Sequence, residues 1–469
     1  MIWKICTVMV WTANVLVLSY FLILNTVYLA TSTFAFRALR KYVRRVKAMN
    51  FEKFITSAVA PPITLIVPAY NEEATCIEST RSLLTLNYPD YEILLINDGS
   101  KDETERCLTS VFEMVPVARL PTASLPAGTV RKVLRSQRYQ NLWLIDKENG
   151  GKADALNAGL NYTRTPLYAA MDADSVLERD ALNRIVSPFL EDATTIAVGG
   201  IIRIANGCTI RSGIVESVRL PKKLLAQFQV LEYLRAFLAG RMGWNAIKAT
   251  LIISGALGLF RRSVVVAAGG YATDTVGEDM ELIVRLHHHC LKNKIPYRIL
   301  YVPDPIAWTE CPETLESLGR QRDRWQRGLV DSIWRHRQML FNPRYGIIGL
   351  VAYPYFFFLE MMGPVIEFFG YAAFAVALAL GLYSVYFIVA FFMVAFILGI
   401  VLSIAAVGLE ELSLRRYRNL SDLIRLFLLA IAENFGYRQL STFWRVKGVI
   451  SSLRHVKGWG AMKRKGFRG

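Results

Sequence analysis

The sequence lacks the features that mark several common classes of protein. It has few cysteines, with no CxxC pair and no cysteine–histidine spacing of a zinc site, so we interpret the thiols as reduced and cytosolic. They are Cys6, Cys76, Cys107, Cys208, Cys290 and Cys311. It has no internal repeat, proline-rich linker or low-complexity region. The spacing GxxxxGK[ST] is also missing, which argues against ATP hydrolysis.

Acidic residues are outnumbered, 38 against 55 lysines and arginines, which gives a formal net charge of +17. Such a charge fits nucleic acid, anionic lipid or a polyphosphate substrate. No nucleic-acid motif accompanies it, so we predict no nucleic-acid partner. Much of it flanks apolar blocks, where membrane proteins carry their cytoplasmic basic residues. These are Arg37, Arg40, Lys41, Arg44, Arg45 and Lys47, and later Arg415, Arg416 and Arg418.

Long apolar blocks predict a protein integral to a lipid bilayer. At 469 residues, 53% of them hydrophobic, the chain fits a soluble catalytic unit plus a membrane region. Ile5 to Ala30 is uncharged and long enough to cross ~30 Å of hydrocarbon, and too long for a signal-peptide core. The basic stretch after it predicts an outside N-terminus and a cytoplasmic start for the next part of the chain.

A second apolar block runs from Tyr345 to Gly408 and carries only Glu360 and Glu367 as charges. We expect it to break into two spans at 381–384. Ser421–Leu440 is a weaker third segment. Three crossings would put the basic tail KRKGFRG outside, against the charge rule, so we expect this segment to be re-entrant or to have a partner in 443–453. The parity of spans stays open.

The part from Pro61 onward has the texture of an α/β domain, with short β-branched runs separated by turns and amphipathic stretches. The expected strands are Ile63–Val67, Glu92–Ile96, Leu142–Ile145, Leu167–Met171 and Ile196–Ile204. Leu220–Ile247 is predicted to be helical and Leu251–Arg261 to be an apolar strand. A mostly parallel sheet should bring functional residues to its carboxyl edge.

Polar and acidic residues lie at the ends of three of these strands. Asn71 and Glu72 follow the first strand and Asp98 follows the second, at the edge where open α/β sheets bind nucleotides. The alternative for Asp98 is a simple turn, because Asp-Gly-Ser alone usually forms one. In LYAAMDADS, Asp172 and Asp174 are two apart and would point the same way in extended chain. Two oxygen ligands suit Mg²⁺ or Mn²⁺. The alternative is a solvated turn with a helix cap.

Three further segments carry candidate chemistry. Lys152 lies in KENGGKADALNAG, a glycine-containing loop that opens a helix and suits an anion such as a donor phosphate. In GEDMEL, Asp279 is a candidate general base, with Glu278 next to it in the sequence. Alternatively, both acids only stabilise the start of a helix through its dipole. The consecutive His287, His288 and His289 cannot face one metal, so we interpret them as surface or packing residues.

The segment Pro312–Leu340 is predicted to be an amphipathic helix lying in the membrane interface, with packing on the domain as the alternative. Its expected apolar stripe comprises Leu315, Leu318, Trp325, Leu329 and Ile333. The motif QRDRW places Gln321, Arg324 and Trp325 within one turn. Arginine suits a diphosphate and an aromatic ring suits a sugar face.

The ordered motifs NDGS, DAD, GED and QRDRW, with flanking apolar segments, resemble the membrane-bound family-2 glycosyltransferases, which include cellulose, hyaluronan, chitin and poly-N-acetylglucosamine synthases. The resemblance runs from Ile63 to the tail. It implies an α/β GT-A fold and a processive, inverting transfer of sugar from a UDP-sugar. The favoured donors are UDP-N-acetylglucosamine and UDP-glucose. The expected product is a growing β-linked polysaccharide that crosses the plasma membrane. An accessory subunit for export is a further expected partner.

The resemblance also implies roles for individual residues. It assigns uridine contact to Asp98, nucleotide and Mg²⁺ or Mn²⁺ binding to Asp172 and Asp174, and the base to Asp279. Around the donor it adds Gln321 and Arg324, and around the acceptor Trp325, Ser254 and Gly255. From their places in the sequence, we also predict that Glu72 and Lys152 bind the donor. One departure is Gly277, which stands where the family usually has threonine before the two acids.

The implied organisation has six parts and two rival functions. The parts are 1–35 (transmembrane helix), 36–60 (basic linker), 61–311 (catalytic domain), 312–344 (interfacial helix), 345–442 (transmembrane helices) and 443–469 (basic tail). One rival is an enzyme that adds a single sugar to a lipid acceptor. The other is a catalytically silent membrane scaffold.

Overall fold

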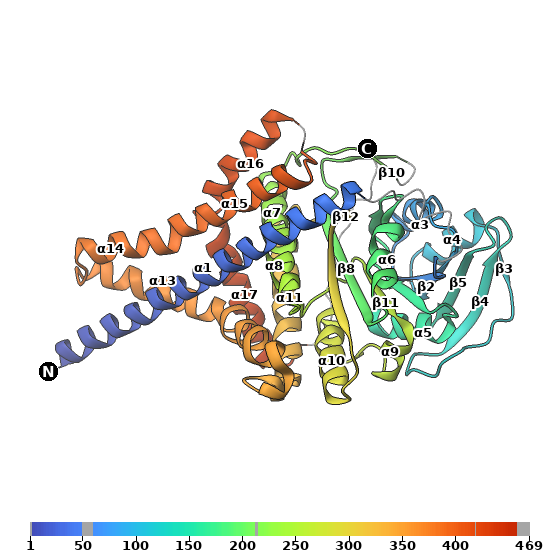
Figure 1. Ribbon diagram of the computed structural model, residues 1–469, viewed down its shortest axis with the longest axis horizontal. Helices are drawn as coiled ribbons and strands as arrows, with labels where there is room; N and C mark the ends of the chain where they lie inside the picture. Colours follow the sequence, from blue (N-terminus) through green and yellow to red (C-terminus); the bar gives the residue numbers. More distant parts are fainter. Residues whose placement is uncertain (1, 49–59, 212–213, 418, 457–469) are drawn as a thin grey trace. The chain divides into compact units, whose positions relative to one another are not determined.

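The protein is described by a computed structural model that covers residues 2–48, 60–211, 214–417 and 419–456 (Figure 1). The chain folds into two compact units. Among the described residues, the first unit comprises 2–41, 222–247 and 312–456, and the second comprises 42–221 and 248–311. Residues 222–247 therefore belong with the apolar helices of the first unit, although they lie inside the range 61–311 expected for the catalytic domain. Of the basic tail expected over 443–469, residues 457–469 lie outside the described residues, whereas 443–453 are helical.

The second unit is built on a ten-stranded sheet in the order β3-β4-β5-β2-β1-β6-β11-β8-β12-β7 (Figure 1). The strands are β1 (Ile63–Ala69), β2 (Tyr91–Asp98), β3 (Met114–Pro116), β4 (Val130–Ser136), β5 (Leu142–Lys147), β6 (Leu167–Ala170), β7 (Ser175–Leu177), β8 (Thr195–Ile204), β11 (Gly258–Arg261) and β12 (Arg298–Thr309). The central strands β5, β2, β1 and β6 are parallel, whereas β11 runs antiparallel to β6 and β8. The hairpin β9 (Thr209–Arg211) and β10 (Ile214–Ser217) is separate.

Helices cover this sheet and bury its apolar strands. They are α3 (Cys76–Leu84), α4 (Thr104–Val111), α5 (Lys152–Tyr162), α6 (Ala181–Glu191), α9 (Arg262–Ala267) and α10 (Glu278–Lys292). Ile66, Leu94 and Leu282 belong to one buried cluster between these layers. Helix α5 lies close to the sheet because Gly159 faces Ile66, and a Cβ at this glycine would be 2.3 Å from the Ile66 side chain. Strands buried on both faces explain the continuous apolar runs in the sequence.

The α/β class and the five expected strands are confirmed, with β6 ending one residue before Met171. The prediction of a strand over Leu251–Arg261 is wrong for most of its length, because only Gly258–Arg261 forms β11. Leu257 donates its amide hydrogen to the Ser254 carbonyl at 3.2 Å, so the chain turns there. Leu251 and Leu257 are still buried. The apolar character of this segment reflects its burial and not strand pairing.

The first unit contains helices that are long and apolar enough to cross a membrane. Two candidates, Val10–Arg44 within α1 (Ile2–Ala48) and Val385–Ser413, satisfy length and composition among the described residues. The helical pair Ile348–Met361 and Gly363–Ala379, bent by 43°, gives a third if it is one span. These segments appear as the long helices α1, α13 and α14–α15 in Figure 1. The described part of the chain thus contains two to three candidate spans.

The remaining helical bounds complete the first unit. They are α7 (Leu224–Tyr233), η1 (Leu234–Gly240), α8 (Arg241–Ala246), α11 (Leu315–Arg335), η2 (Arg337–Met339), η3 (Pro343–Tyr345), η4 (Ile348–Ala352), α12 (Tyr353–Tyr355), η5 (Phe356–Met361), α13 (Gly363–Ala379), α14 (Val385–Phe392), η6 (Met393–Ile397), α15 (Leu398–Ser413), α16 (Leu420–Ala432) and α17 (Tyr437–Leu453). The helical prediction for Leu220–Ile247 is confirmed from Leu224 to Ala246, and the break at 381–384 between α13 and α14 is confirmed.

The weak third segment, Ser421–Leu440, is not one long helix. It divides into α16 and α17, and Gly436 between them has a φ of 111°, a conformation that favours glycine. Neither helix is among the candidate spans. Helix α17 contains residues 443–453, the stretch expected to hold a partner for this segment, so the boundary placed at 442 falls inside a helix.

The two acids of the second apolar block have polar partners. Glu360 accepts a hydrogen bond from Tyr355 at 2.7 Å and forms an ion pair with Arg445 at 3.1 Å. Glu367 accepts one from the Thr442 hydroxyl at 3.0 Å. An acid in an apolar segment is costly without such partners. Helix α17 supplies Arg445 and Thr442, which explains why it packs within the first unit.

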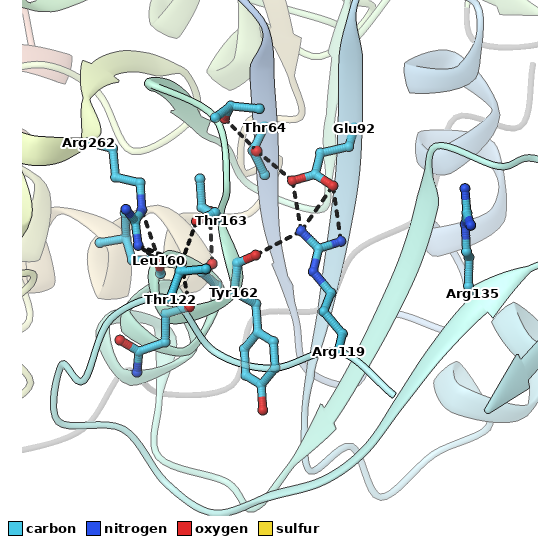
Figure 2. A network of polar contacts seen from close by, with 12 residues as sticks. Thr64, Glu92, Arg119, Thr122, Arg135, Leu160, Tyr162, Thr163 and Arg262 are labelled. Atoms are coloured by element: carbon cyan, nitrogen blue, oxygen red, sulfur yellow. Dashed lines mark hydrogen bonds and ion pairs between the residues drawn. The ribbon is translucent and has the colours of Figure 1, made fainter. Parts of the chain in front are cut away.

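A buried ion pair fastens the segment between β3 and β4 to the sheet (Figure 2). The Arg119 side chain is 2% exposed, lies 2.9 Å from Glu92 on β2, and donates to the Tyr162 carbonyl at 2.7 Å. Its guanidinium carbon also lies 4.3 Å from the centre of the Trp143 ring. Arg135 stacks on the same ring at 4.9 Å but leaves Glu92 untouched.

We expect Arg119→Ala to lower the free energy of unfolding by about 3 kcal/mol, because it leaves the Glu92 carboxylate without its buried partner. The matched control is Arg135→Ala, which removes a stacking contact on the same tryptophan and should cost less than about 1 kcal/mol. Thermal unfolding of the purified protein measures both. Equal losses for the two variants would contradict the importance of the ion pair.

Candidate active site

Hydrogen bonds join the loops after β1 and β2 at the carboxyl edge of the sheet. Asn71 has a φ of 55° and accepts a hydrogen bond from the Lys101 amide at 2.8 Å. The Glu72 amide donates to the Thr104 hydroxyl at 2.8 Å, and the Glu72 carboxylate accepts from the Thr75 hydroxyl at 2.7 Å. The Asn-Glu pair therefore shapes the edge at which the sequence predicted nucleotide binding.

Asp98 ends β2 and is buried. One carboxylate oxygen accepts the Gly150 amide at 3.0 Å and the other accepts the Gly151 amide at 2.8 Å. Burial raises the pKa of Asp98, although its hydrogen bond with Lys147 and the two amides act in the opposite direction. Both oxygens already hold the glycine loop in place. In this structure Asp98 shapes the loop that presents Lys152.

Lys147, at the end of β5, was missed by the sequence reasoning. Its side chain is fully buried, and its ammonium lies 2.6 Å from Asp98 and 2.5 Å from Asp154. Asp154 in turn accepts the Gly128 amide at 3.0 Å. A buried lysine is stable only when paired, and here two acids share it. The available signal was a lysine directly after an apolar strand, but its acidic partners are distant in sequence.

Lys152 is the first residue of α5 and lies among three acids. Its ammonium is 2.5 Å from Asp172 and 3.3 Å from Glu278. Burial alone would lower the pKa of Lys152, but the charges of Asp172, Glu278 and Asp279 outweigh it and raise that pKa above its ordinary value. Lys152 is therefore a fixed positive charge beside a cluster of carboxylates.

Asp172 and Asp174 lie in the turn between β6 and β7, so the extended geometry expected for them is wrong. The Ser175 amide donates to the Asp172 carbonyl at 3.1 Å, which closes this turn. The Asp172 side chain is 31% exposed, whereas Asp174 is 7% exposed. Lys152 draws Asp172 toward α5, a contact that local sequence does not reveal.

The residues fit a divalent cation that takes part of its coordination from elsewhere. Within the described parts of the chain, no group of three or more His, Cys, Asp or Glu side chains could hold a metal alone. Mg²⁺ commonly uses one or two carboxylates and keeps waters and substrate phosphates as further ligands. The accessible Asp172 can supply one such carboxylate.

The two acids that open α10 have different surroundings. Asp279 is partly exposed, and its carboxylate accepts the Gly255 amide at 3.0 Å and the Met280 amide at 2.8 Å. Glu278 is buried and faces Lys152. Burial raises the pKa of Glu278 to about 7, with Lys152 lowering it and Asp279 raising it further. Asp279 is thus the more accessible of the two acids, and Glu278 is the one that holds Lys152.

The segment ISGALG brings Gly255 against both charges. A Cβ added at Gly255 would lie 2.6 Å from the Lys152 ammonium and 3.6 Å from a carboxylate oxygen of Asp279. The Ser254 hydroxyl accepts the Ala256 amide at 3.4 Å, so it belongs to the same turn. Four predicted residues of different loops, Lys152, Asp172, Gly255 and Asp279, are therefore brought together.

The histidine run supports this loop. The His287 ring lies 2.7 Å from the Tyr297 hydroxyl and 2.8 Å from the Thr250 carbonyl. Burial lowers the pKa of His287 to about 4, so the ring is neutral near pH 7. The prediction of a packing role is confirmed for His287, which ties α10 to the start of the segment that carries Gly255.

The QRDRW motif lies on α11, in the first unit. Gln321 and Arg324 are buried, whereas Trp325 is 42% exposed. The Arg322 guanidinium carbon lies 4.4 Å from the centre of the Trp325 ring, and Arg322 pairs with Glu232 at 2.8 Å. The motif therefore presents a tryptophan ring that is supported from one side by a fixed arginine.

The predicted apolar stripe on α11 is only partly its packed face. Leu318 and Ile333 are fully buried, whereas Leu315 is 56% exposed. The buried positions of the helix also include polar side chains such as Gln321 and Gln326. Gln326 donates to the Met361 carbonyl at 3.1 Å, and Arg445 of α17 donates to Gln326 at 2.9 Å. Hydrogen bonding to neighbouring helices, which periodicity cannot detect, decides which side is buried.

Comparison with known proteins identifies the class to which this arrangement belongs. Residues 61–328 match the family described as glycosyltransferase like family 2, and the chain belongs to that family. The match covers the sheet, the cluster of acids and the QRDRW motif.

Curated relatives include poly-β-1,6-N-acetyl-D-glucosamine synthases. The protein of Staphylococcus aureus strain COL is 30% identical over 266 residues, which is 57% of this chain and 54% of the relative. That of Staphylococcus epidermidis is 28% identical over 267 residues, with the same coverage. The chain spans about half the length of the curated relatives it matches, so the homology to these synthases is distant.

A solved structure confirms the fold. The mannosyltransferase PcManGT of Pyrobaculum calidifontis, in complex with GDP-mannose and Mn²⁺, aligns with a TM-score of 0.50 at 21% identity. The alignment covers 88% of this chain and 99% of the mannosyltransferase. The second unit therefore has a mixed α/β sheet of the GT-A type, combined with long apolar helices in the first unit.

The raised pKa of Glu278 gives a prediction for stability against pH. Because the folded pKa is about 7 and the ordinary value 4.5, the folded protein binds the proton more tightly. We compare the free energies of unfolding of the natural protein and Glu278→Gln in the absence of divalent cations. The natural protein should lose up to about 3 kcal/mol relative to the variant as the pH rises from 4.5 to 7, and the difference should then stay constant. Melting temperatures of both proteins across this range test it. A difference independent of pH, or one that rises with pH, would contradict the assignment.

Gly255→Ala should lower the turnover number by at least about tenfold, because the new methyl group pushes the Lys152 ammonium out of place. The atom that this methyl group meets is the tip of a flexible side chain, so folding should be nearly unaffected. The control is Gly408→Ala, where nothing lies within 4 Å of an added Cβ. Sugar-transfer rates and melting temperatures should separate the two. Full activity of Gly255→Ala would show that close approach is not required.

Proposed function

We propose that the protein is a processive, inverting glycosyltransferase that builds a β-linked polysaccharide from a UDP-sugar and passes it across the plasma membrane. The observation that carries this proposal is the meeting of Lys152, Asp172 and Asp279 at the carboxyl edge of a family-2 sheet. A cation suited to a diphosphate lies there beside a partly exposed carboxylate suited to an acceptor hydroxyl.

The donor we favour is UDP-N-acetylglucosamine, with UDP-glucose next. The names of the staphylococcal relatives, poly-β-1,6-N-acetyl-D-glucosamine synthases, support the first choice. The motif set supports uridine as the nucleotide. We propose that Asp98, Glu72 and Lys152 bind the donor, and that Gln321 and Arg324 bind its diphosphate. Ser254, Gly255 and the exposed ring of Trp325 would contact the acceptor end.

The proposed reaction is one in-line displacement. Asp279 accepts the proton of the acceptor hydroxyl, whose oxygen forms the new bond to the anomeric carbon. The bond from that carbon to the diphosphate breaks, and UDP leaves with the electron pair. The backbone amides of Gly255 and Met280 hold the Asp279 carboxylate in position for this transfer. An α-linked donor would give a β linkage.

Charge on the leaving UDP needs a positive partner. Lys152 supplies one from the start of α5, where the helix N-terminus adds favourable backbone dipoles. Asp172 and Asp174 would hold Mg²⁺ or Mn²⁺, which would stabilise the same diphosphate charge when bound. The buried Glu278 keeps Lys152 beside this position.

Export of the polymer is proposed from the apolar helices. In the first unit, Glu360 and Tyr355 belong to the bent helical pair that forms a candidate span if it is one span, and they make a polar cluster with Arg445 of the neighbouring helix α17. Polar groups in such segments commonly line a path for a polar substrate. We propose that the catalytic unit faces the cytoplasm and that an accessory subunit can join the export path.

The test supplies the purified protein in lipid with Mg²⁺ or Mn²⁺ and a panel of radiolabelled UDP-sugars, and measures UDP release and product length. We expect a long product from one donor. Asp279→Asn should lower the rate by about 100- to 10,000-fold, since it removes the base. The control is Asp90→Asn, an exposed acid of the same unit, which should leave the rate unchanged.

The same assay separates the rivals. UDP release with only a short, lipid-linked product would contradict processivity and favour transfer of a single sugar. No release with any donor would favour a silent scaffold. Full activity of Asp279→Asn would contradict its role as the base.

A further inference from the structure

Lys152 pairs with the carboxylate to which we assign a divalent cation in the proposed function. Its ammonium is 2.5 Å from the Oδ1 of Asp172, the more exposed of the two acids proposed to hold a cation. A lysine ammonium and a divalent cation both need the same carboxylate oxygens, and two positive charges cannot share one at close range without a large repulsion. Binding of the metal at Asp172 therefore requires Lys152 to move.

The surroundings of Lys152 provide for such a move. Glu278 lies 3.3 Å from the ammonium and is almost fully buried, so it can keep the lysine paired after Asp172 is lost. Gly255 leaves open the space beside the ammonium that a larger residue would fill. A long, flexible lysine side chain can travel between these partners without movement of the backbone.

We propose that Lys152 is a displaceable counter-ion, which neutralises Asp172 while donor and metal are absent and is exchanged for the divalent cation when they bind. This rests on the proposed function, because it assigns Asp172 to the metal. Lys152 would then carry out two tasks in turn. Before binding it prevents repulsion among Asp172, Glu278 and Asp279, and after binding its released ammonium is available to the donor diphosphate.

Removal of Lys152 should therefore strengthen metal binding, which is opposite to the effect expected for an ordinary site residue. Lys152→Met should bind Mn²⁺ about tenfold more tightly than the natural protein in the absence of donor, because the competing cation is gone. Electron paramagnetic resonance of free Mn²⁺, titrated with the purified full-length chain, measures this directly. Lys292→Met is the control, since it removes one positive charge from the exposed end of α10, far along the helix from Glu278.

Tighter binding by Lys152→Met alone supports the exchange. Unchanged or weaker binding would overturn it, and an equal gain in both variants would reduce it to a general effect of net charge. Should Lys152→Met fail to fold, acetylation of lysines in the natural protein, read by mass spectrometry, replaces it. Mn²⁺ should then increase labelling of Lys152 severalfold, and no increase would overturn the exchange.

These outcomes are separate from those for the proposed function. Mn²⁺ binding is measured without a sugar donor, whereas UDP release is measured with one. Sugar transfer together with an unchanged Mn²⁺ affinity of Lys152→Met would reject the exchange and keep the enzyme. Tighter Mn²⁺ binding without transfer from any donor would keep the exchange and reject the enzyme.

Discussion

The ion pairs of Lys152 with Asp172 and Glu278 are the interactions on which the site depends. Three carboxylates cannot lie together in a partly buried region unless a positive charge offsets them. Lys152 provides that charge from the start of α5, and Gly255 allows it to approach. The acids come from the turn after β6 and the start of α10, so this single ammonium unites three segments of the catalytic unit.

A second buried lysine stabilises the loop that carries the first. Lys147 pairs with Asp98 and Asp154, and Asp98 in turn holds the amides of Gly150 and Gly151, directly before Lys152. The backbone at Lys152 is thus held by hydrogen bonds that reach back to the end of β2. Removing either partner of such a buried pair is costly, so the loop has little freedom of its own.

The strands and the acids could be predicted well from the sequence because both are local patterns. Apolar runs ended by Asp98 or Asp172 and the acidic GED segment are visible without knowledge of the fold, and Asp172 and Asp279 do meet in the structure near Lys152. The features that could not be predicted depend on contacts between distant segments. Lys147 looked like an ordinary charged residue, and the 251–257 stretch looked like a strand although it forms a turn.

The first unit shows the same limit. Length and composition were enough to find the apolar helices and the break between α13 and α14. The division of Ser421–Leu440 at Gly436, and the polar packed face of α11, depend on hydrogen bonds among helices that no periodicity reveals. Membership of glycosyltransferase family 2 rests on the ordered motifs and on the matched family, and the distant relatives place the chain beside polysaccharide synthases.

The central claim is that the cluster around Lys152 is the donor site of a glycosyltransferase. The most direct measurement is a cryo-electron microscopy structure of Asp279→Asn, which should keep the donor intact, with UDP-N-acetylglucosamine and Mn²⁺. The account predicts the diphosphate beside Lys152, the metal at Asp172 and the anomeric carbon facing residue 279. A donor bound elsewhere on the protein, with Lys152 still paired to Asp172, would contradict it.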